Sequence, residues 1–370
     1  MRKAAVFGLL TVLLTYAVPL FIPSIPLASG KFTVGWQPYY ISSFHVAIIK
    51  ELGLWKKYLP AGTEIEFQEA LHGSVSWNSM LSGKCQVAYL SVASGNLACS
   101  KRDQAEIRFA SNVGISNGMR CALLMVRADA PDFKSQDEAV RWLNGKVVAS
   151  PRGSCADQFL RVVFWRHGIQ PAEYLNQSIE VLQSSLRSGK VDAAAVWEPV
   201  AGRVGNLAGD GLAKIVATGS IVGNKDIGMV IMRGDFIDKH PSLVEGYLKA
   251  ELEALLFLTD PVNQRQAVEM ISKYAVGIPK KVIWHSLYGE IPTEVGGTSP
   301  RETFSFIIDE KIRKNINEVW ARQYEDKLVR TERPPGNIID DRHARKVLSA
   351  YNLKSPIGVI KGQPPSENPF

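Results

Sequence analysis

The feature that most constrains the fold is an alternation of short apolar stretches with longer amphipathic ones. Residues 31–36, KFTVGW, are rich in strand formers, and residues 42–53 follow with a serine cap and apolar side chains at helical spacing. We predict further strands at 64–69 and 86–90, with a turn and helix at 71–81 between them. Strands that alternate with helices form parallel βαβ units, so the pattern predicts an α/β sheet.

The same alternation recurs in the second half of the chain. Strands are predicted at 145–150, 179–182 and 191–197, separated by helices at 154–167 and 184–188. A chain of 370 residues that is 46% hydrophobic can bury one large core or two medium ones. A local echo supports two similarly built lobes, because MLSGKCQVA and LRSGKVDAA each read as a helix end, a Ser-Gly-Lys turn and a buried strand.

The boundaries of the lobes follow from a second echo. The stretches CALLMVRAD at 121–129 and GMVIMRGD at 228–235 are apolar strands that end in Arg-x-Asp, and they bracket the second set of units. A chain that leaves one lobe and returns needs two such crossings. We therefore expect lobe 1 at 31–118 plus 228–290, and lobe 2 at 119–227.

The C-terminal part is predicted to be mainly helical. Residues 241–258 have the pattern of a long amphipathic helix. Residues 291–370 then form a helical extension, with a helix at 302–328 and a tail from Arg330 that we expect to lie on the surface or to be mobile.

The N-terminus has the pattern of a secretory signal peptide. A basic start precedes the apolar run from Ala4 to Ile22, and small residues follow, so residues 1–28 are expected to be removed by cleavage after Ala28. The alternative is an uncleaved membrane anchor, since the run approaches the roughly 20 residues that span a bilayer. Both alternatives place the folded chain in the periplasm.

Charge excludes a nucleic-acid function. The formal charge is +7, and removal of Arg2 and Lys3 leaves +5 without a dense basic block. A nucleic-acid interface requires basic residues clustered on one face. The chain is instead a mildly basic protein that attracts anions weakly.

The four cysteines have no metal-binding or redox spacing. In an oxidising compartment Cys85, Cys99 and Cys121 are expected to supply one disulfide, although the sequence does not choose the pair. Free, buried cysteines are the alternative. We expect no metal and no cofactor.

Four stretches resemble, in the same order, the periplasmic solute-binding proteins of ABC importers for sulfonates, taurine, nitrate and bicarbonate. They are FHVAIIKELGLW at 44–55, LNGKVVASPRGS at 143–154, GKVDAAAVWEP at 189–199 and DKHPSLV at 238–244. The resemblance covers residues 31–290. It implies a two-lobed α/β clamp of type II, with two crossing strands and a ligand held between lobes that close by hinge motion.

Ligands in open α/β sheets bind beyond the carboxyl ends of the strands. The first turns of this kind offer Gln37 and Tyr39, then Gly73 and Ser74 at a helix start that favours anions, and then Ser91. Each also has a structural interpretation: loop packing for the first pair, an ordinary helix cap for Ser74, and close packing of small residues around Ser91.

The stretch SPRGSCADQF at 150–159 offers the strongest candidates. Ser154 begins a helix with Asp157 three residues later, which is the pattern of a capping box. Gly153 allows close backbone approach, and Cys155 is expected to contribute its backbone N–H. In the family that the chain resembles, the matching Gly-Ser turn contacts the anion.

Two further candidates come from the second lobe and the second crossing. Trp197 and Glu198, in Trp-Glu-Pro, match a turn of the family, and the tryptophan is expected to face the cleft. Glu198 would repel a bare anion, so it implies either a ligand that also has an ammonium group or a role at the hinge. Asp226 is expected to meet a cation or to tie the hinge.

The resemblance implies a non-catalytic function. The expected protein is a monomer that delivers a small anionic or zwitterionic organic solute to an ABC permease and ATPase at the inner membrane. The alternatives are binding or synthesis of a thiamin-pyrimidine precursor, and ligand sensing for a membrane receptor. An enzyme with a Cys155 nucleophile would need a base, for which His72 is the candidate. We expect no enzyme, because the cysteine-rich motif of the thiamin-pyrimidine synthases is absent from the sequence.

Overall fold

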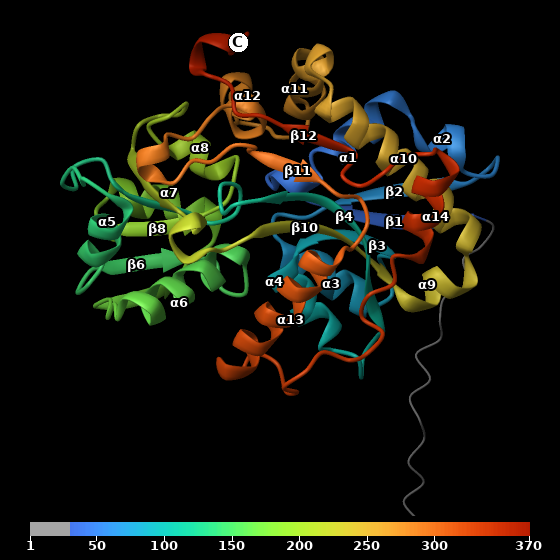
Figure 1. Cartoon of the computed structure of the whole chain (residues 1–370), viewed down its shortest axis with the longest axis horizontal. Coiled ribbons are helices and arrows are strands. Elements are labelled where there is room, and N and C mark those ends of the chain that lie inside the picture. The colour runs from blue at the N-terminus through green and yellow to red at the C-terminus, as the bar shows by residue number, and fades with distance from the viewer. Residues whose placement is uncertain (1–29) are drawn as a thin grey trace, which may run out of the picture.

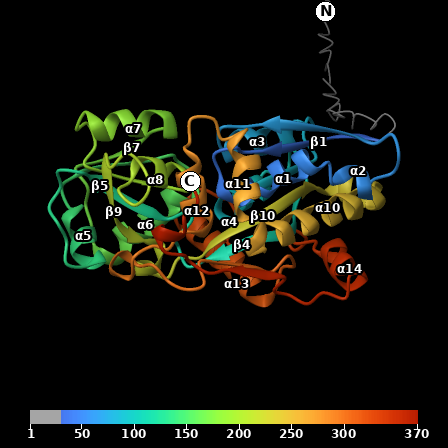
Figure 2. The same ribbon diagram turned by 90° about the horizontal axis from the view of Figure 1, so that it is seen from above.

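The computed structural model describes residues 30–370, which form two lobes, each built on its own sheet (Figure 1). The larger sheet has the strand order β12-β11-β4-β10-β3-β1-β2, and the smaller one has the order β7-β6-β8-β5-β9. In a view turned by 90° from that of Figure 1, the two lobes also lie side by side (Figure 2). The predicted two-lobed α/β architecture is therefore confirmed.

Lobe 1 contains parallel and antiparallel strands. The first strand pairs in parallel with its two neighbours, whereas β10 pairs antiparallel with β3 and β4. Its elements are β1 (Lys31–Trp36), α1 (His45–Leu52), α2 (Trp55–Tyr58), β2 (Glu64–Glu69), α3 (Gly73–Leu81), β3 (Val87–Ser91), α4 (Val92–Cys99), β4 (Ile107–Ser116), β10 (Asp226–Arg233), α9 (Gly234–Lys239), α10 (Pro241–Thr259), α11 (Gln264–Ser272), α12 (Lys280–Tyr288), β11 (Glu302–Phe304), α13 (Glu310–Glu325), α14 (Arg342–Ala350) and β12 (Gly358–Ile360).

Lobe 2 is one continuous stretch of chain. Its strands β6, β7 and β8 are parallel, and β5 runs antiparallel between β8 and β9. Its elements are β5 (Leu123–Arg127), α5 (Gln136–Trp142), β6 (Val147–Ser150), α6 (Cys155–His167), β7 (Glu173–Asn176), α7 (Ile179–Arg187), β8 (Ala193–Val196), α8 (Val200–Val204) and β9 (Ala213–Thr218).

The sheet of lobe 1 is covered on both faces. Along β3, Val87 and Tyr89 join one apolar cluster, whereas Ala88 and Leu90 join another. The first cluster contains residues of α1, α10, α11 and α12, and the second contains residues of α4 and α13. Successive side chains of a strand point to opposite faces, so a sheet buried on both sides has apolar residues without alternation.

The two Ser-Gly-Lys turns occupy equivalent places in the lobes. Gly83 joins α3 to β3 and Gly189 joins α7 to β8, and both have a positive φ, of 79° and 72°. The lysine that follows each glycine donates its amide to a serine carbonyl in the preceding helix. The predicted similarity between the lobes is thus present at this turn.

One pair of elements in lobe 2 was predicted wrongly. The strand expected at 179–182 and the short helix at 184–188 are a single helix, α7, and the strand of this region is β7, upstream of it. The buried residues Ile179, Leu182 and Leu186 are three and seven positions apart, which is helical spacing.

The C-terminal extension also differs from the prediction. Residues 302–304 form strand β11 rather than the start of a helix, and α13 begins only after Asp309, whose side chain accepts from the Ile312 amide at 2.9 Å. The segment after Arg330 lies mostly on the surface, as one of the two predicted alternatives had it, and β12 within it pairs with β11 at the edge of the large sheet. The extension is thus part of lobe 1.

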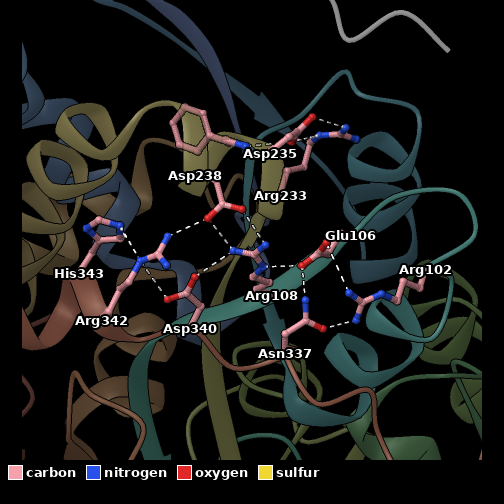
Figure 3. A network of polar contacts seen from close by, with 11 residues as sticks. Arg102, Glu106, Arg108, Arg233, Asp235, Asp238, Asn337, Asp340, Arg342 and His343 are labelled. Atoms are coloured by element: carbon pink, nitrogen blue, oxygen red, sulfur yellow. Dashed lines mark hydrogen bonds and ion pairs between the residues drawn. The ribbon is translucent and has the colours of Figure 1, made fainter. Parts of the chain in front are cut away.

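A network of ion pairs attaches the extension to lobe 1 (Figure 3). Arg108 on β4 contacts Glu106 at 2.7 Å, Asp238 on α9 at 2.8 Å and Asp340 of the extension at 3.0 Å. Arg342 contacts the same two aspartates from the other side. The guanidinium of Arg108 therefore joins three segments that are distant in sequence.

The chain passes between the lobes at 117–122 and again at 219–225. A third segment, the loop between α12 and β11, packs beside both passages. In this loop the Gly296 carbonyl accepts from Thr218 Oγ1 at 3.0 Å, and Thr298 Oγ1 accepts from Asn117 at 3.1 Å. The lobes are therefore joined by three neighbouring segments.

The predicted signal peptide, residues 1–28, lies outside the described residues. Among residues 30–370, no helix has the length and apolar character needed to cross a membrane.

Candidate functional site

A cavity of about 310 Å³ lies between the two lobes. Lobe 1 contributes the start of α3 and the first turns of α4, and lobe 2 contributes the ends of β6, β7 and β8. The cavity is lined by His72, Gly73, Ser74, Trp77, Ser94, Leu97, Pro151, Arg152, Gly153, Ser154, Asn176, Gln177, Ser178 and Trp197.

The β6–α6 turn is held by the predicted capping box. The Asp157 amide donates to Ser154 Oγ at 3.1 Å, and the Gly153 amide donates to the Asp157 carboxylate at 2.9 Å. The Ser154 hydroxyl donates to the Pro151 carbonyl at 2.7 Å. Both the Gly153 amide and the Ser154 side chain are thus used within the turn, which fixes the direction of α6 at the cavity.

The start of α3 has a different construction. Its N-cap residue, His72, forms no side-chain cap, and the His72 imidazole instead contacts Ser74 Oγ at 3.1 Å. Among residues 30–370, the amides of Gly73 and Ser74 have no hydrogen-bond acceptor. A Cβ atom on Gly73 would lie 2.8 Å from the Leu90 side chain, so glycine is needed there for close packing. Free amides at a helix start favour an anion.

The lobes touch beside this cavity. Ser94 Oγ on α4 donates to the Gly153 carbonyl at 3.0 Å. Trp197 links the lobes on another side, since its indole N–H donates to the Tyr39 carbonyl at 2.8 Å. The clamp is therefore closed in this structure.

Arg152 supplies a positive charge to the cavity wall. Its guanidinium lies 4.3 Å from the centre of the Tyr174 ring and donates to the Tyr174 carbonyl at 3.0 Å, while its amide donates to Asn176. Within the described part of the chain, no carboxylate forms an ion pair with Arg152. The charge is thus held in place by an aromatic face and a carbonyl, without an ion-pair partner among the described residues.

Three candidates from the early turns do not line this cavity. Gln37 is buried and donates from its side-chain amide to the Tyr89 carbonyl at 2.9 Å. Ser91 is the N-cap of α4 and accepts from the Ser94 amide at 3.3 Å. Tyr39 lines a neighbouring cavity of about 200 Å³, and its hydroxyl donates to the Val276 carbonyl.

Glu198 and Asp226 lie at the junction of the lobes, away from the cavity. The Glu198 carboxyl is fully buried, accepts from the Gly202 amide at 2.8 Å and from Ser286 Oγ at 3.0 Å, and lies 3.6 Å from Arg301. Burial raises its pKa, and Arg301 opposes this shift. Glu198 therefore gives no reason to expect an ammonium group on the ligand.

Asp226 ties the two crossings together. Its carboxylate accepts from the amides of Arg120 and Cys121 at 2.7 and 2.8 Å, and from Ser116 Oγ at 3.1 Å. Burial raises the pKa of this carboxyl. Asp226 was expected either to meet a cation or to tie the hinge. Its contacts in the structure are those of a residue that ties the hinge.

Cys155 forms a disulfide with Cys121. The prediction that a disulfide would use two of Cys85, Cys99 and Cys121 was therefore wrong, since Cys85 and Cys99 are free and buried. The fold brings the start of α6 next to the first crossing, and sequence spacing contains no signal for that approach. Cys155 has no thiol in this structure, so it is not a nucleophile with His72 as base.

Sequence reasoning missed several residues of the cavity. Asn176 is the last residue of β7, and Gln177 and Ser178 follow it. The same strand-end rule would have found these residues had the strand been placed correctly. Trp77 lies about one turn beyond Ser74 and Leu97 six residues beyond Ser91, both in helices, and helical periodicity would have indicated them. Arg152 lies inside the stretch that the sequence had already singled out.

Comparison with known proteins is consistent with this architecture. The chain is 25% identical over 248 residues to the taurine-binding periplasmic protein of Escherichia coli (strain K12), an alignment that covers 65% of this chain and 70% of that protein. The alkanesulfonate-binding protein SsuA from Xanthomonas axonopodis pv. citri, solved bound to MOPS, superposes with a TM-score of 0.66 at 16% identity, covering 85% of this chain and 99% of that one.

The fold is also used by an enzyme. The desulfurization enzyme DSZB superposes with a TM-score of 0.59 at 14% identity, over 87% of this chain and 99% of the enzyme. At these identities the superpositions show the shared fold. The model of the NMT1-like family matches residues 28–272. The chain therefore belongs to the NMT1-like family and has the two-lobed fold of the type II periplasmic binding proteins.

Proposed function

We propose that the protein is the extracytoplasmic solute-binding component of an ABC importer for a small organic anion of the sulfonate class. The observation that supports this most directly is the cavity between the lobes. The starts of α3, α6 and α7 meet there, and Arg152 adds an unpaired guanidinium. Helix starts and arginine both favour an anionic group.

Two other observations support the proposal. The taurine-binding relative is periplasmic by name, and the Cys121–Cys155 disulfide suits an oxidising compartment. The proposed ligand contacts are Gly73, Ser74, Gly153, Ser154 and Trp197 among the sequence candidates, joined by Trp77, Ser94, Arg152, Asn176, Gln177 and Ser178. A permease and an ATPase would receive the closed, liganded form.

A thermal-shift screen of the purified protein tests the proposal. The panel contains sulfonates, taurine, nitrate, bicarbonate, aromatic carboxylates and thiamin precursors. A ligand present at a hundred times its Kd should add about 2.7 kcal/mol to the free energy of unfolding. Stabilisation by a thiamin precursor alone, or turnover of a solute, would contradict the proposal.

Arg152→Gln provides the matching test of the site. Hydrogen bonds to charged groups contribute about 1.5–3 kcal/mol, so affinity for the stabilising anion should fall at least tenfold. Arg141→Gln is the control, because Arg141 is exposed on α5 in the same lobe and lies outside the cavity. Its partner is Asp137 on the same helix. An equal loss in both variants would show that net charge, rather than the cavity, attracts the anion.

A further inference from the structure

The walls of the interlobe cavity are chemically one-sided. The side chains that line it are hydroxyls, amides, one imidazole, one guanidinium, two indoles and apolar groups. Within residues 30–370, no Asp or Glu side chain belongs to this lining. The Asp157 carboxylate of α6 accepts from the Gly153 amide and the Arg161 guanidinium and lines a separate void of about 10 Å³.

An ammonium group in this cavity would be poorly matched. Arg152 and the start of α3, which has no acidic residue in its first turn, place positive potential there, and no carboxylate lines the cavity itself. The indole faces attract cations, but by about 0.5–2 kcal/mol at most sites, which is comparable with the repulsion expected from one nearby guanidinium. For a zwitterion such as taurine, repulsion at the ammonium group would therefore cancel some of the binding free energy gained at the sulfonate.

The two tryptophans face the same cavity from opposite lobes. Trp77 belongs to the second turn of α3 in lobe 1, and Trp197 directly follows β8 in lobe 2. The indole of Trp197 is only 4% exposed and is fixed by its hydrogen bond to the Tyr39 carbonyl. Closure of the clamp thus brings one aromatic wall from each lobe against the ligand.

The size of the cavity is consistent with a ring between these walls. About 310 Å³ lies at the lower end of the range of about 300–1,000 Å³ that holds drug-sized ligands. It is more space than a two-carbon sulfonate needs. The side-chain oxygen of Gln177 is also buried without a partner at this wall, and rotation of its amide would present N–H groups to an anionic head.

Resting on the function proposed above, we infer that the ligand is an aromatic anion without an ammonium group. Its sulfonate or carboxylate lies at Arg152 and the helix starts, and its ring lies between Trp77 and Trp197. This differs from the ligand named for the taurine-binding relative.

Four probes separate the parts of this inference in titration calorimetry of the purified protein. Taurine and ethanesulfonate differ by the ammonium, ethanesulfonate and benzenesulfonate differ by the ring, and benzenesulfonate and benzoate differ by the head group. We expect ethanesulfonate to bind at least as tightly as taurine, and benzenesulfonate about tenfold more tightly than ethanesulfonate.

The outcomes distinguish this inference from the proposed function. Tighter binding of taurine than of ethanesulfonate, or no gain from the ring, overturns the inference and leaves a sulfonate-binding protein. Binding of benzoate without any sulfonate overturns the sulfonate class and supports the aromatic anion. Absence of binding by all four probes overturns both.

Variants of Trp77 test whether the aromatic ring of the ligand packs against this side chain. Trp77→Leu keeps apolar volume and should weaken benzenesulfonate about tenfold while changing ethanesulfonate less than twofold. Trp55→Leu is the matched control, since Trp55 lies on α2 in the same lobe, is half-buried like Trp77 and lies outside the cavity. Trp77→Phe keeps a ring and should restore most of the affinity. Equal losses for both sulfonates in Trp77→Leu would refute the stacking role.

Discussion

His285, at the residue scale, is a buried base in the junction between the lobes. It lies on α12, is 3% exposed, and precedes Ser286, which hydrogen-bonds to Glu198. Burial, and to a lesser extent the positive charge of Arg301, lowers the pKa of this imidazole to about 3. The imidazole is thus neutral in the folded protein at every pH above that value.

We expect His285 to make the protein less stable in acid. Between pH 6.5 and 3 the unfolded chain binds a proton at this residue that the folded chain does not, so stability falls as pH decreases through this window. The slope from one such group is about 1.4 kcal/mol per pH unit. The free energy of unfolding is measured in urea for the wild type and for His285→Gln at pH 7, 5.5 and 4.5. As the pH falls, the wild type should lose more stability than the variant. A constant difference would mean that the imidazole is already protonated in the folded state.

Single residues also mark where sequence reasoning was limited. Glu198 and Asp226 have the residue types of ligand contacts, and their sequence neighbourhood suggested the cleft. Their partners, Ser286 and Arg301 for one and the amides of the first crossing for the other, are distant in sequence. Only the assembled junction shows that these carboxylates are satisfied internally.

Ser154, at the scale of the element, determines how α6 begins. Ser154→Ala removes the acceptor for the Asp157 amide and should lower the free energy of unfolding by about 1 kcal/mol. Ser154→Asp preserves an N-cap acceptor, so its free energy of unfolding should fall less than that of Ser154→Ala. Chemical denaturation of the two variants provides the measurement, and equal stability of Ser154→Ala and wild type would show that the cap does not stabilise the fold.

Arg108 should be sensitive to a change that preserves its charge. The guanidinium forms two parallel contacts with Asp238, at 2.9 and 2.8 Å, besides those with Glu106 and Asp340 (Figure 3). Lysine has no planar fork, so Arg108→Lys should lower stability by about 1–2 kcal/mol.

Salt provides the check on this prediction. The Arg108 side chain is only 12% exposed, so the deficit of Arg108→Lys should largely persist in 1 M NaCl, because salt screens partly buried ion pairs much less than exposed ones. Arg265→Lys is the control, since the one ion pair that Arg265 forms among residues 30–370 is with Glu269 on its own helix and is exposed. A loss in Arg265→Lys as large as that in Arg108→Lys would contradict the role of the network.

Elements were predictable where the local pattern was strong. The strands β1 and β2 and the helices α3, α6 and α10 lie where apolar spacing and caps placed them. No strand was predicted at β4, although it is central in the large sheet. Residues 302–304 and 358–360 form three-residue strands because they pair with each other, and 302–304 also pairs with β4. So short a segment has no periodicity of its own.

The closed clamp, at the scale of the molecule, is held partly by the C-terminal extension. Helix α13 is bound to lobe 1, where Gln323 donates to the Ala93 carbonyl at 2.8 Å. It reaches lobe 2 through Arg322, whose guanidinium lies 4.3 Å from the Trp165 ring centre. Asp326, just beyond α13, lies 3.7 Å from Arg161 of α6. Opening of the lobes requires these contacts to separate.

Asp326→Asn should therefore favour the open form. Ion pairs of this exposure contribute about 0.2–1 kcal/mol, so the ratio of closed to open molecules should fall up to about fivefold. Small-angle X-ray scattering of the unliganded protein should show a larger radius of gyration, with unchanged resistance to urea. Glu318→Gln is the control, since its partner Lys314 lies on the same helix. No change in the scattering would mean that this pair does not hold the lobes together.

The order of the strands also determines when each lobe is complete. Lobe 2 takes all its strands from one stretch, β5 to β9, that ends at Thr218. The large sheet takes its first strand at Lys31 and its last at Ile360, ten residues before the end of the 370-residue chain. In a chain that is made or exported from its N-terminus, lobe 2 can fold before the edge strands β11 and β12 of lobe 1 are available. The lobe that is begun first is finished after the other, so its apolar strands need protection until synthesis has passed Ile360.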